Sequence, residues 1–217
     1  GKTVLVTGAS RGIGYGIAKG FARSGADLTI LADDAQVFQA AQRLSAETGR
    51  NVRAVQCDIT DVAQIKQATD QLGRLDVLIN NAGLERTTPI TDPDNAVEDT
   101  FRRIIDINVM GTFLMTRHAL PKMGKGGRII LTASIWGRTA VAEYSAYCAS
   151  KHANIGFMRS MAHELAPLGI NVNAVCPGWV KTEAALLTLS KMSQSSGRPE
   201  DDLLKEIIAG QVLDGLL

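Results

Sequence analysis

The stretch TVLVTGASRGIG, residues 3–14, decides the fold of this chain of 217 residues. Thr3 to Thr7 are β-branched or apolar, which is typical of a buried strand, and three glycines lead from them into a helical pattern over residues 16–24. Gly25 ends that helix, and residues 26–31 are predicted to form a second buried strand. In such a unit the glycines let backbone segments come close, and the helix N-terminus offers free N–H groups to a pyrophosphate. The pattern therefore favours nucleotide binding over a plain tight turn.

Strand and helix patterns continue to alternate after this unit. Helices are predicted at residues 35–47, 62–72, 96–120 and 145–166, and strands at 51–56, 75–79, a run ending before Ser134, and 171–175. This alternation predicts an α/β fold of the Rossmann type, a doubly wound parallel sheet with helices on both faces. Ligands of such folds lie beside the carboxyl ends of the strands, so the loops there are candidate binding segments.

Composition excludes several classes of partner. The net charge is +1 and no run of Lys or Arg stands out, so nucleic acid and anionic membranes are not expected as partners. No apolar stretch has the length of a membrane span, and no secretory signal is recognised. Cys57, Cys148 and Cys176 show no paired spacing and suit a reducing cytoplasm. No cluster has metal-ligand spacing, so no metal is expected.

A tyrosine and a lysine lie four residues apart on the long helix at 145–166. On a helix this spacing places the Tyr147 phenol and the Lys151 ammonium on one face. A free tyrosine titrates near pH ~10, and an acid or base near neutrality needs a pKa lower by about 3 units, or about 4 kcal/mol. A cation about 4 Å away at an effective dielectric of about 20 supplies that amount. The pair predicts a proton-exchanging tyrosine, although such a lysine can also be a solvated surface residue.

Five motifs in the same order resemble the short-chain dehydrogenase/reductase family. They are Thr-Gly-x-x-x-Gly-x-Gly at 7–14, Asn-Asn-Ala-Gly at 80–83, Asn-Val-x-Gly at 108–111, Ser134 thirteen residues before Tyr147, and Pro-Gly at 177–178. They span almost the whole chain. The resemblance implies hydride transfer between a nicotinamide dinucleotide and an alcohol or ketone.

The resemblance also implies roles for individual residues. Tyr147 exchanges the proton with the substrate oxygen, and Ser134 orients that oxygen. Lys151 lowers the pKa of Tyr147 and binds the nicotinamide ribose, and Asn108 holds a water that connects Lys151 to solvent. The cofactor would contact these catalytic residues Tyr147 and Lys151 and a further set: Gly8, Ser10, Arg11, Gly12, Ile13, Gly14, Asp33, Asp58, Ile59, Asn81, Ala82, Gly83, Pro177, Gly178, Val180 and Thr182. Asp58 could instead cap the helix at 62–72.

NAD is favoured over NADP. Asp33 and Asp34 follow the second strand, where an acidic group can bind the adenosine ribose hydroxyls and repel a 2′-phosphate. No Arg or Lys is expected nearby to hold a phosphate. The alternative is that the two residues only cap the helix that begins near Ala35.

The substrate is expected to lack a carboxylate. Several stretches look most like 3-hydroxybutyrate dehydrogenases, which grip a carboxylate with a Gln, a His and a Lys. At the matching positions this chain has Glu85, Trp136 and Tyr144, and Trp179 is a fourth candidate substrate residue. Glu85 would repel a carboxylate, so a polyol, a sugar or another non-carboxylate substrate is predicted, with a cationic group also conceivable.

One catalytic domain is expected over residues 1–217, with residues 183–217 forming a lid over the substrate. Members of the family continue with a seventh strand, so either the sequence is truncated after Leu217 or the sheet has an open edge. The helices at 96–120 and 145–166 carry apolar groups around much of their circumference, which predicts a homodimer, or a homotetramer.

Two other functions fit part of the pattern. A catalytically inactive dinucleotide sensor or scaffold protein would need only the glycine turn, and the intact set Ser134, Tyr147 and Lys151 argues against it. A hydroxyacid dehydrogenase would need a carboxylate grip that Glu85 opposes.

Overall fold

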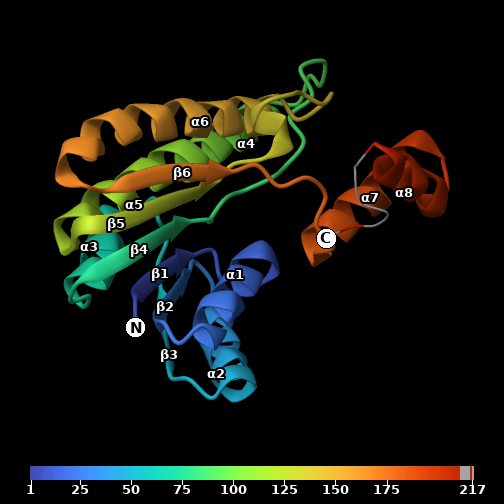
Figure 1. The fold of residues 1–217 in the computed structure, drawn as a ribbon. Helices are drawn as coiled ribbons and strands as arrows, with labels where there is room; N and C mark the ends of the chain where they lie inside the picture. Colours follow the sequence, from blue (N-terminus) through green and yellow to red (C-terminus); the bar gives the residue numbers. More distant parts are fainter. Residues whose placement is uncertain (211–215, 217) are drawn as a thin grey trace. The chain divides into compact units, whose positions relative to one another are not determined.

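A computed structural model describes residues 1–210 and Leu216. The chain divides into two compact units, Gly1–Cys176 and Pro177–Leu217. The first unit holds one sheet of six parallel strands in the order β3-β2-β1-β4-β5-β6 (Figure 1). Its strands are β1 (Thr3–Thr7), β2 (Asp27–Ala32), β3 (Val52–Gln56), β4 (Leu75–Asn80), β5 (Met123–Thr132) and β6 (Asn171–Val175). The predicted doubly wound parallel sheet is confirmed.

Helices cover both faces of this sheet, as Figure 1 shows. They are α1 (Gly12–Arg23), α2 (Gln36–Thr48), α3 (Val62–Asp70), α4 (Ala96–Ile105), the π-helix η1 (Asp106–Gly111), α5 (Thr112–Ala119) and α6 (Ser145–Leu165). Three short 3₁₀ helices follow the longer elements: η2 (Leu120–Lys122), η3 (Ile135–Gly137) and η4 (Ala166–Leu168). The switch in strand order lies between β1 and β4, where a doubly wound sheet opens a ligand-binding crevice.

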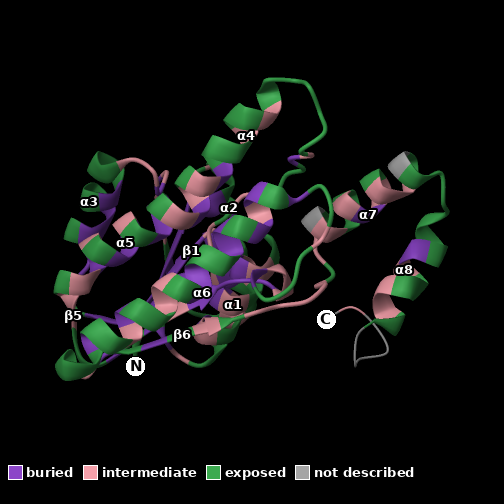
Figure 2. Ribbon diagram, turned by 90° about the horizontal axis from the view of Figure 1, so that it is seen from above, coloured by how far each residue is buried: buried purple, intermediate pink, exposed green. Residues whose placement is uncertain are grey.

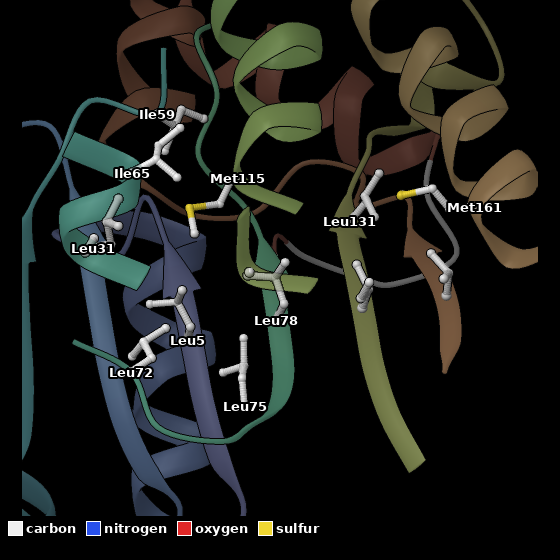
Figure 3. Close-up of a cluster of buried hydrophobic side chains, with 14 of the residues drawn as sticks. Leu5, Leu31, Ile59, Ile65, Leu72, Leu75, Leu78, Met115, Leu131 and Met161 are labelled. Atoms are coloured by element: carbon white, nitrogen blue, oxygen red, sulfur yellow. The ribbon is translucent and has the colours of Figure 1, made fainter. Parts of the chain in front are cut away.

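Alternation along the strands builds one core on each face of the sheet. Val4 and Val6 of β1 pack in the cluster formed with α1 and α2, whereas Leu5 packs in the cluster formed with α3, α5 and α6. In Figure 3, Met115 of α5 reaches between Ile65 of α3 and Leu78 of β4. Figure 2 shows that the buried residues are concentrated in the strands and on the inner sides of the helices. The two cores fix the strand ends that carry the site.

Two helices differ from their predicted form. The first helix begins at Gly12 rather than at residue 16, because the last glycines of the turn already form its first turn. The helix predicted at 96–120 is interrupted by η1, whose six residues include Asn108. Such π-helical stretches are rare inside helices and are frequent at functional sites. The long helix α6 ends as expected, with Gly169 in the left-handed conformation at φ +69°.

The second unit contains α7 (Glu183–Ser196) and α8 (Glu200–Ala209). Thr182 caps α7, because its Oγ1 accepts a hydrogen bond of 3.1 Å from the N–H of Ala185. Gly197, at φ +67°, ends that helix, so the helix continues through the break expected at Ser193–Gly197. The lid predicted at 183–217 includes residues 211–215 and 217, which lie outside the described residues.

Candidate active site

The glycine-rich turn after β1 brings two backbone segments into close contact. Gly8 has a φ of +63°, and a Cβ there would lie 2.7 Å from the Cα of Ala82. A Cβ on Gly14 would overlap the carbonyl oxygen of Gly8. A side chain at either position would force the turn away from the segment that follows β4, so only glycine fits.

This turn runs directly into the N-terminus of α1. Arg11 precedes the helix and makes no side-chain capping hydrogen bond to it, so the N–H groups of the first turn remain available to a ligand. A turn free of side chains beside a helix N-terminus fits a pyrophosphate group. The structure places the predicted cofactor residues of this region together at the carboxyl end of β1: Gly8, Ser10, Arg11, Gly12, Ile13 and Gly14.

One hydroxyl group joins the ends of β1 and β4. Thr7 Oγ1 accepts hydrogen bonds of 3.0 Å from the N–H groups of Asn81 and Ala82, and it donates to the carbonyl oxygen of Ile79. The side-chain amide of Asn81 donates to the carbonyl oxygens of Thr7 and Gly8, both at 3.1 Å. Asn81 and Ala82, which belong to the predicted cofactor set, therefore hold the glycine turn in place.

The acidic pair after β2 has a basic neighbour. Asp33 is exposed, whereas Asp34 Oδ2 pairs with Arg11 Nη1 at 2.8 Å, and Asp34 Oδ1 accepts from the N–H of Gln36 at the start of α2. Arg43 of α2 also reaches this turn, 3.5 Å from the carbonyl oxygen of Ser10. The expectation that no basic side chain is close enough to hold a phosphate is wrong, because the fold brings Arg11 next to Asp34.

Asp58 is not the cap of α3. Asp61 has that role, since its side chain accepts from the N–H groups of Ala63 and Gln64. Asp58 accepts from the N–H and hydroxyl of Thr60 and pairs with Arg103 at 3.1 Å. Burial acts to raise the pKa of Asp58, but these hydrogen bonds and Arg103 lower it overall. The expected contacts of Asp58 and its buried neighbour Ile59 with a cofactor stay predictions.

The three predicted catalytic residues of the proton relay come together. Ser134 follows β5 and forms the N-cap of η3, and Tyr147 and Lys151 lie on α6. Tyr147 forms a side-chain hydrogen bond with Ser134. Lys151 Nζ lies 5.4 Å from the centroid of the Tyr147 ring and donates to the carbonyl oxygen of Thr132 at 2.8 Å. A Cβ on Gly83 would lie 3.6 Å from this ammonium, so Gly83 lies directly beside it at the end of β4.

The electrostatics of this pair differ from the prediction. Burial raises the pKa of Tyr147 above its usual range, the Glu85 carboxylate raises it further, and the hydrogen bond with Ser134 opposes both. Burial lowers the pKa of Lys151 to about 8, against the influence of Glu85 and Cys176. The prediction that the pKa of Tyr147 is lowered is therefore wrong for the protein without a bound dinucleotide, where this pKa is raised. The phenol is protonated at neutral pH.

Asn108 is fully buried in η1 and connects three segments. Its Oδ1 accepts from the N–H of Leu84 at 2.7 Å, and its Nδ2 donates to the carbonyl oxygen of Leu84 and to Ser150 Oγ, both at 2.9 Å. Ser150 precedes Lys151 on α6. The side chain of Asn108 thus positions the loop after β4 against α6, and its expected role in holding a water stays a prediction.

The candidate substrate residues of the first unit form one cluster. The ring centroid of Trp136 lies 5.3 Å from that of Tyr144 and 6.0 Å from that of Tyr147. Glu85 is half-buried and close enough to influence the pKa of both Tyr147 and Lys151. Trp179 and the predicted cofactor residues Pro177, Gly178, Val180 and Thr182 belong to the second unit, and their roles stay predictions.

Some contacts in the site have no signal in the sequence. The carbonyl oxygen of Thr132 holds the Lys151 ammonium, and any residue type offers such an oxygen. Leu84 contributes only backbone atoms to Asn108. Among these residues, only Ser150 could have been predicted as part of the site from its residue type, because it is a polar residue on the inner face of α6.

Three further observations concern the described residues as a whole. They include no group of three or more His, Cys, Asp or Glu that could hold a metal ion. None of their helices combines the length and apolar character needed to cross a membrane. The thiols of Cys57, Cys148 and Cys176 are all free.

Comparison with known proteins gives consistent matches. The model of the short chain dehydrogenase family matches residues 2–191. The D-beta-hydroxybutyrate dehydrogenase of Cupriavidus necator is 37% identical over 96% of this chain and 82% of its own length. The galactitol 2-dehydrogenase of Agrobacterium fabrum is 39% identical over 84% of this chain and 72% of its own length. The structure of L-sorbose reductase from Gluconobacter frateurii, complexed with NADPH and L-sorbose, matches with a TM-score of 0.88 and 26% identity, covering 100% of this chain and 84% of that chain.

Proposed function

The chain belongs to the short-chain dehydrogenase/reductase family, and from this premise we propose that it interconverts a secondary alcohol and a ketone with a nicotinamide dinucleotide. The observation that carries the proposal is the meeting of Ser134, Tyr147 and Lys151 beside Gly83 at the carboxyl end of the sheet. A proton donor, a hydroxyl partner and a buried ammonium are then adjacent to the crevice where a doubly wound sheet binds ligands.

The residues of the site fit such a cofactor. The turn at Gly8 and Gly14 has no room for a Cβ, and the uncapped start of α1 offers N–H groups to the pyrophosphate. Gly83 lies beside Lys151, whose ammonium would bind the nicotinamide ribose. When bound, the dinucleotide supplies the two-electron acceptor or donor, and the protein supplies positioning and electrostatics.

Tyr147 exchanges the proton of the reaction. In oxidation the alcohol carbon would give up its hydrogen with the bonding electron pair to a bound dinucleotide, and the alcohol proton would pass to the phenolate form of Tyr147. In reduction both transfers reverse, so Tyr147 donates a proton to the oxygen of the former carbonyl. The raised pKa keeps Tyr147 protonated at neutral pH, which suits the role of proton donor in the reduction, whereas the oxidation requires the phenolate and is favoured by higher pH. Ser134, hydrogen-bonded to Tyr147, orients the substrate oxygen.

The substrate is a non-carboxylate alcohol or ketone. Glu85 lies close enough to Tyr147 and Lys151 to raise the pKa of both, so its negative charge disfavours a substrate anion at the same place. Relatives named for galactitol and for L-sorbose support a polyol or a sugar. The relative named for D-beta-hydroxybutyrate supports the alternative, a hydroxyacid. Efficient turnover of 3-hydroxybutyrate compared with a polyol panel would contradict the proposed substrate class.

Both forms of the dinucleotide are candidates. Asp33 and Asp34 favour NAD, because their charges repel a 2′-phosphate. Arg11 and Arg43 favour NADP, because their guanidinium groups lie at the same turn. The L-sorbose reductase structure contains NADPH. We favour NAD, because the ion pair with Asp34 neutralises the charge of Arg11 that a 2′-phosphate would need. A cofactor-reduction screen with NAD and NADP side by side tests this preference.

Replacing Tyr147 with Phe tests the proposal. Turnover should fall by about 10³-fold or more, because the proton donor is lost, while dinucleotide affinity changes little. The matched control is Tyr15→Phe, which removes a hydroxyl that bonds Glu47 at the surface of α1. A Tyr147→Phe protein that turns over like the original would instead support the catalytically inactive sensor or scaffold.

A further inference from the structure

Thr88 joins the loop after β4 to the start of α6. It is 1% exposed, although its neighbour Thr87 is exposed. Its N–H donates to the carbonyl oxygen of Glu143 at 2.6 Å, and its carbonyl oxygen accepts from Ser145 Oγ at 2.8 Å. The backbones of Thr88 and Tyr144 form an isolated parallel bridge at the same place. These contacts fix where Thr88 lies relative to the first turn of α6.

The Thr88 hydroxyl caps α6 from outside the helix. The N–H groups of a first helical turn have no partner within the helix, and the N-cap residue of α6, Tyr144, makes no capping bond with its side chain. Thr88 Oγ1 accepts instead from the N–H of Ala146 at 3.0 Å. Thr88 Oγ1 also lies 3.0 Å from Ser145 Oγ, and it is the donor there, because Ser145 gives its only hydroxyl proton to the carbonyl oxygen of Thr88. The hydroxyl of Thr88 thus both donates to and accepts from the first turn of α6.

The backbone just before α6 depends on the same contact. Glu143 has a φ of +68° and is the only non-glycine residue with a positive φ in the described part of the chain. Residues with a side chain rarely adopt this left-handed conformation, and it persists only where surrounding contacts enforce it, often at functional sites. The bond from the N–H of Thr88 to the carbonyl oxygen of Glu143 is such a contact.

Tyr147 lies in the turn that Thr88 caps. It is the third residue of α6 and directly follows Ala146, whose N–H bonds Thr88. Its ring meets Trp136 edge-on at 6.0 Å between ring centroids, and its hydroxyl is bonded to Ser134. A displacement of this first turn would therefore move the phenol away from Ser134. At a reacting group, a misplacement of about 1 Å can lower the rate by about 10²-fold.

We propose that Thr88 is a positioning residue for Tyr147: its hydroxyl caps α6 from the loop after β4 and so holds the phenol at the place of proton exchange. The inference rests on the proposed alcohol–ketone reaction and adds to it a residue that acts through the helix and not on the substrate. The loop after β4 is then tied at both ends, at Leu84 to Asn108 and at Thr88 to α6.

The substitution Thr88→Val tests the proposal, because valine has nearly the shape of threonine and lacks the hydroxyl. With galactitol and NAD as the probe, kcat should fall by about tenfold or more, and the Kd for NAD should change by less than about twofold. Thr88→Ser keeps the hydroxyl and should restore kcat to within about threefold of the original protein. Thr88→Ala, which adds no apolar methyl group beside Ser145, takes the place of Thr88→Val if that variant does not fold.

The matched control is Thr69→Val. Thr69 is 2% exposed, and its hydroxyl donates to the carbonyl oxygen of Ile65 at 2.9 Å within α3. This substitution also removes a buried threonine hydroxyl, but from a helix that carries none of the residues of the proton relay, so kcat should stay unchanged. A fall in kcat as large as that in Thr88→Val would overturn the proposal.

A double substitution separates positioning from general damage. If Thr88 acts through Tyr147, Thr88→Val should lower kcat by less than about twofold in a chain that already carries Tyr147→Phe, because the group that it positions has been changed. An equal fall with and without Tyr147→Phe would show that the cap acts elsewhere in the fold, which contradicts the proposal.

Fluorine resonance gives a readout that needs no turnover. The chain has three tyrosines, and in protein labelled with 3-fluorotyrosine the signal of Tyr147 is identified by its loss in Tyr147→Phe. Thr88→Val should shift or broaden this signal, whereas Thr69→Val should leave it in place. An unchanged signal in Thr88→Val overturns the proposal. If the signal changes but the original protein oxidises neither galactitol nor other polyols, the positioning of Tyr147 by Thr88 stands and the proposed reaction fails.

Discussion

At the scale of single residues, the ammonium of Lys151 is a charge that is costly to bury. Its folded pKa of about 8 lies below the ordinary value of 10.5. Between these two pH values the unfolded chain holds the proton and the folded chain does not. Stability therefore rises with pH through this window, and the full cost of the buried charge is present below it.

The substitution Lys151→Met should show this cost. The free energy of unfolding of the original protein, relative to Lys151→Met, should rise by about 2 kcal/mol between pH 7 and pH 9.5. Urea unfolding at several pH values measures it. Lys66→Met, at an exposed position of α3, serves as the control and should run parallel to the original protein. Parallel curves for Lys151→Met as well would show that Lys151 keeps its ordinary pKa and stays charged in the folded protein throughout this pH range.

Asp34 is the residue on which the choice of dinucleotide depends. The substitution Asp34→Asn removes the partner of Arg11 and one negative charge, so affinity for NADPH relative to NADH should rise by about tenfold. Fluorescence titration of both dinucleotides measures the ratio. Asp27→Asn breaks a similar exposed pair with Arg53, distant in the sequence from the glycine turn, and should leave the ratio unchanged. An unchanged ratio in Asp34→Asn would mean that Arg11 does not meet the ribose.

These residues show the limit of what the sequence could predict. The spacing of Tyr147 and Lys151 follows from helix geometry and was predicted correctly as a pair. The direction of the Tyr147 pKa was wrong, because it depends on burial and on Glu85, which lies 62 positions earlier in the chain. The pairing of Arg11 with Asp34 likewise joins two loops that only the parallel alignment of β1 and β2 brings together.

At the scale of elements, η1 shapes the site through Asn108. The substitution Asn108→Ala leaves the N–H and carbonyl oxygen of Leu84 and the hydroxyl of Ser150 without this partner. We expect the free energy of unfolding to fall by about 2–4 kcal/mol, together with slower turnover, because the loop after β4 loses its anchor. Urea unfolding and steady-state kinetics measure both effects.

Thr100→Ala is the control for this change. Thr100 is half-buried on α4 and its hydroxyl donates to the carbonyl oxygen of Ala96 in its own helix, so its loss should cost about 0.5 kcal/mol or less. If Asn108→Ala were no more harmful than Thr100→Ala, the three hydrogen bonds of the Asn108 side chain would contribute little to stability.

The elements themselves were largely predictable because their signals are local. The strand, glycine turn and helix at residues 3–23 follow from residue types within one short window, and the structure confirms them. The π-helical stretch was missed, because the sequence at 96–120 has an uninterrupted helical pattern. The extra residue per turn there is stabilised by contacts of Asn108 with Leu84 and Ser150, which no local pattern contains.

At the scale of the whole molecule, an apolar face remains on the first unit. Phe101, Met110 and Phe113 are exposed large apolar residues of α4, η1 and α5, and the Phe113 ring lies 5.9 Å from that of Phe157 on α6. Large exposed apolar patches mark interaction sites. This face fits the homodimer predicted through the same two helices.

The substitution Phe113→Glu should therefore give a monomer. Light scattering coupled to size exclusion should show twice the chain mass, or a higher multiple, for the original protein and a single chain mass for the variant. Leu168→Glu places the same charge at another exposed apolar position, beside the end of α6, and should not change the mass. A monomeric original protein would contradict the predicted assembly.

The anchoring of the loop after β4 has a consequence for how new specificities arise. The anchor at Leu84 uses its backbone N–H and carbonyl oxygen, and the anchor at Thr88 uses its backbone N–H and its own hydroxyl. Neither anchor uses a side chain of residues 85–87, which lie between them. Substitutions at Glu85, Arg86 and Thr87 should therefore leave the backbone between the two anchors in place, while a change at Glu85 also alters the pKa of Tyr147 and Lys151. Substrate specificity can therefore change through substitutions in this tripeptide alone, without a change in the fold around it.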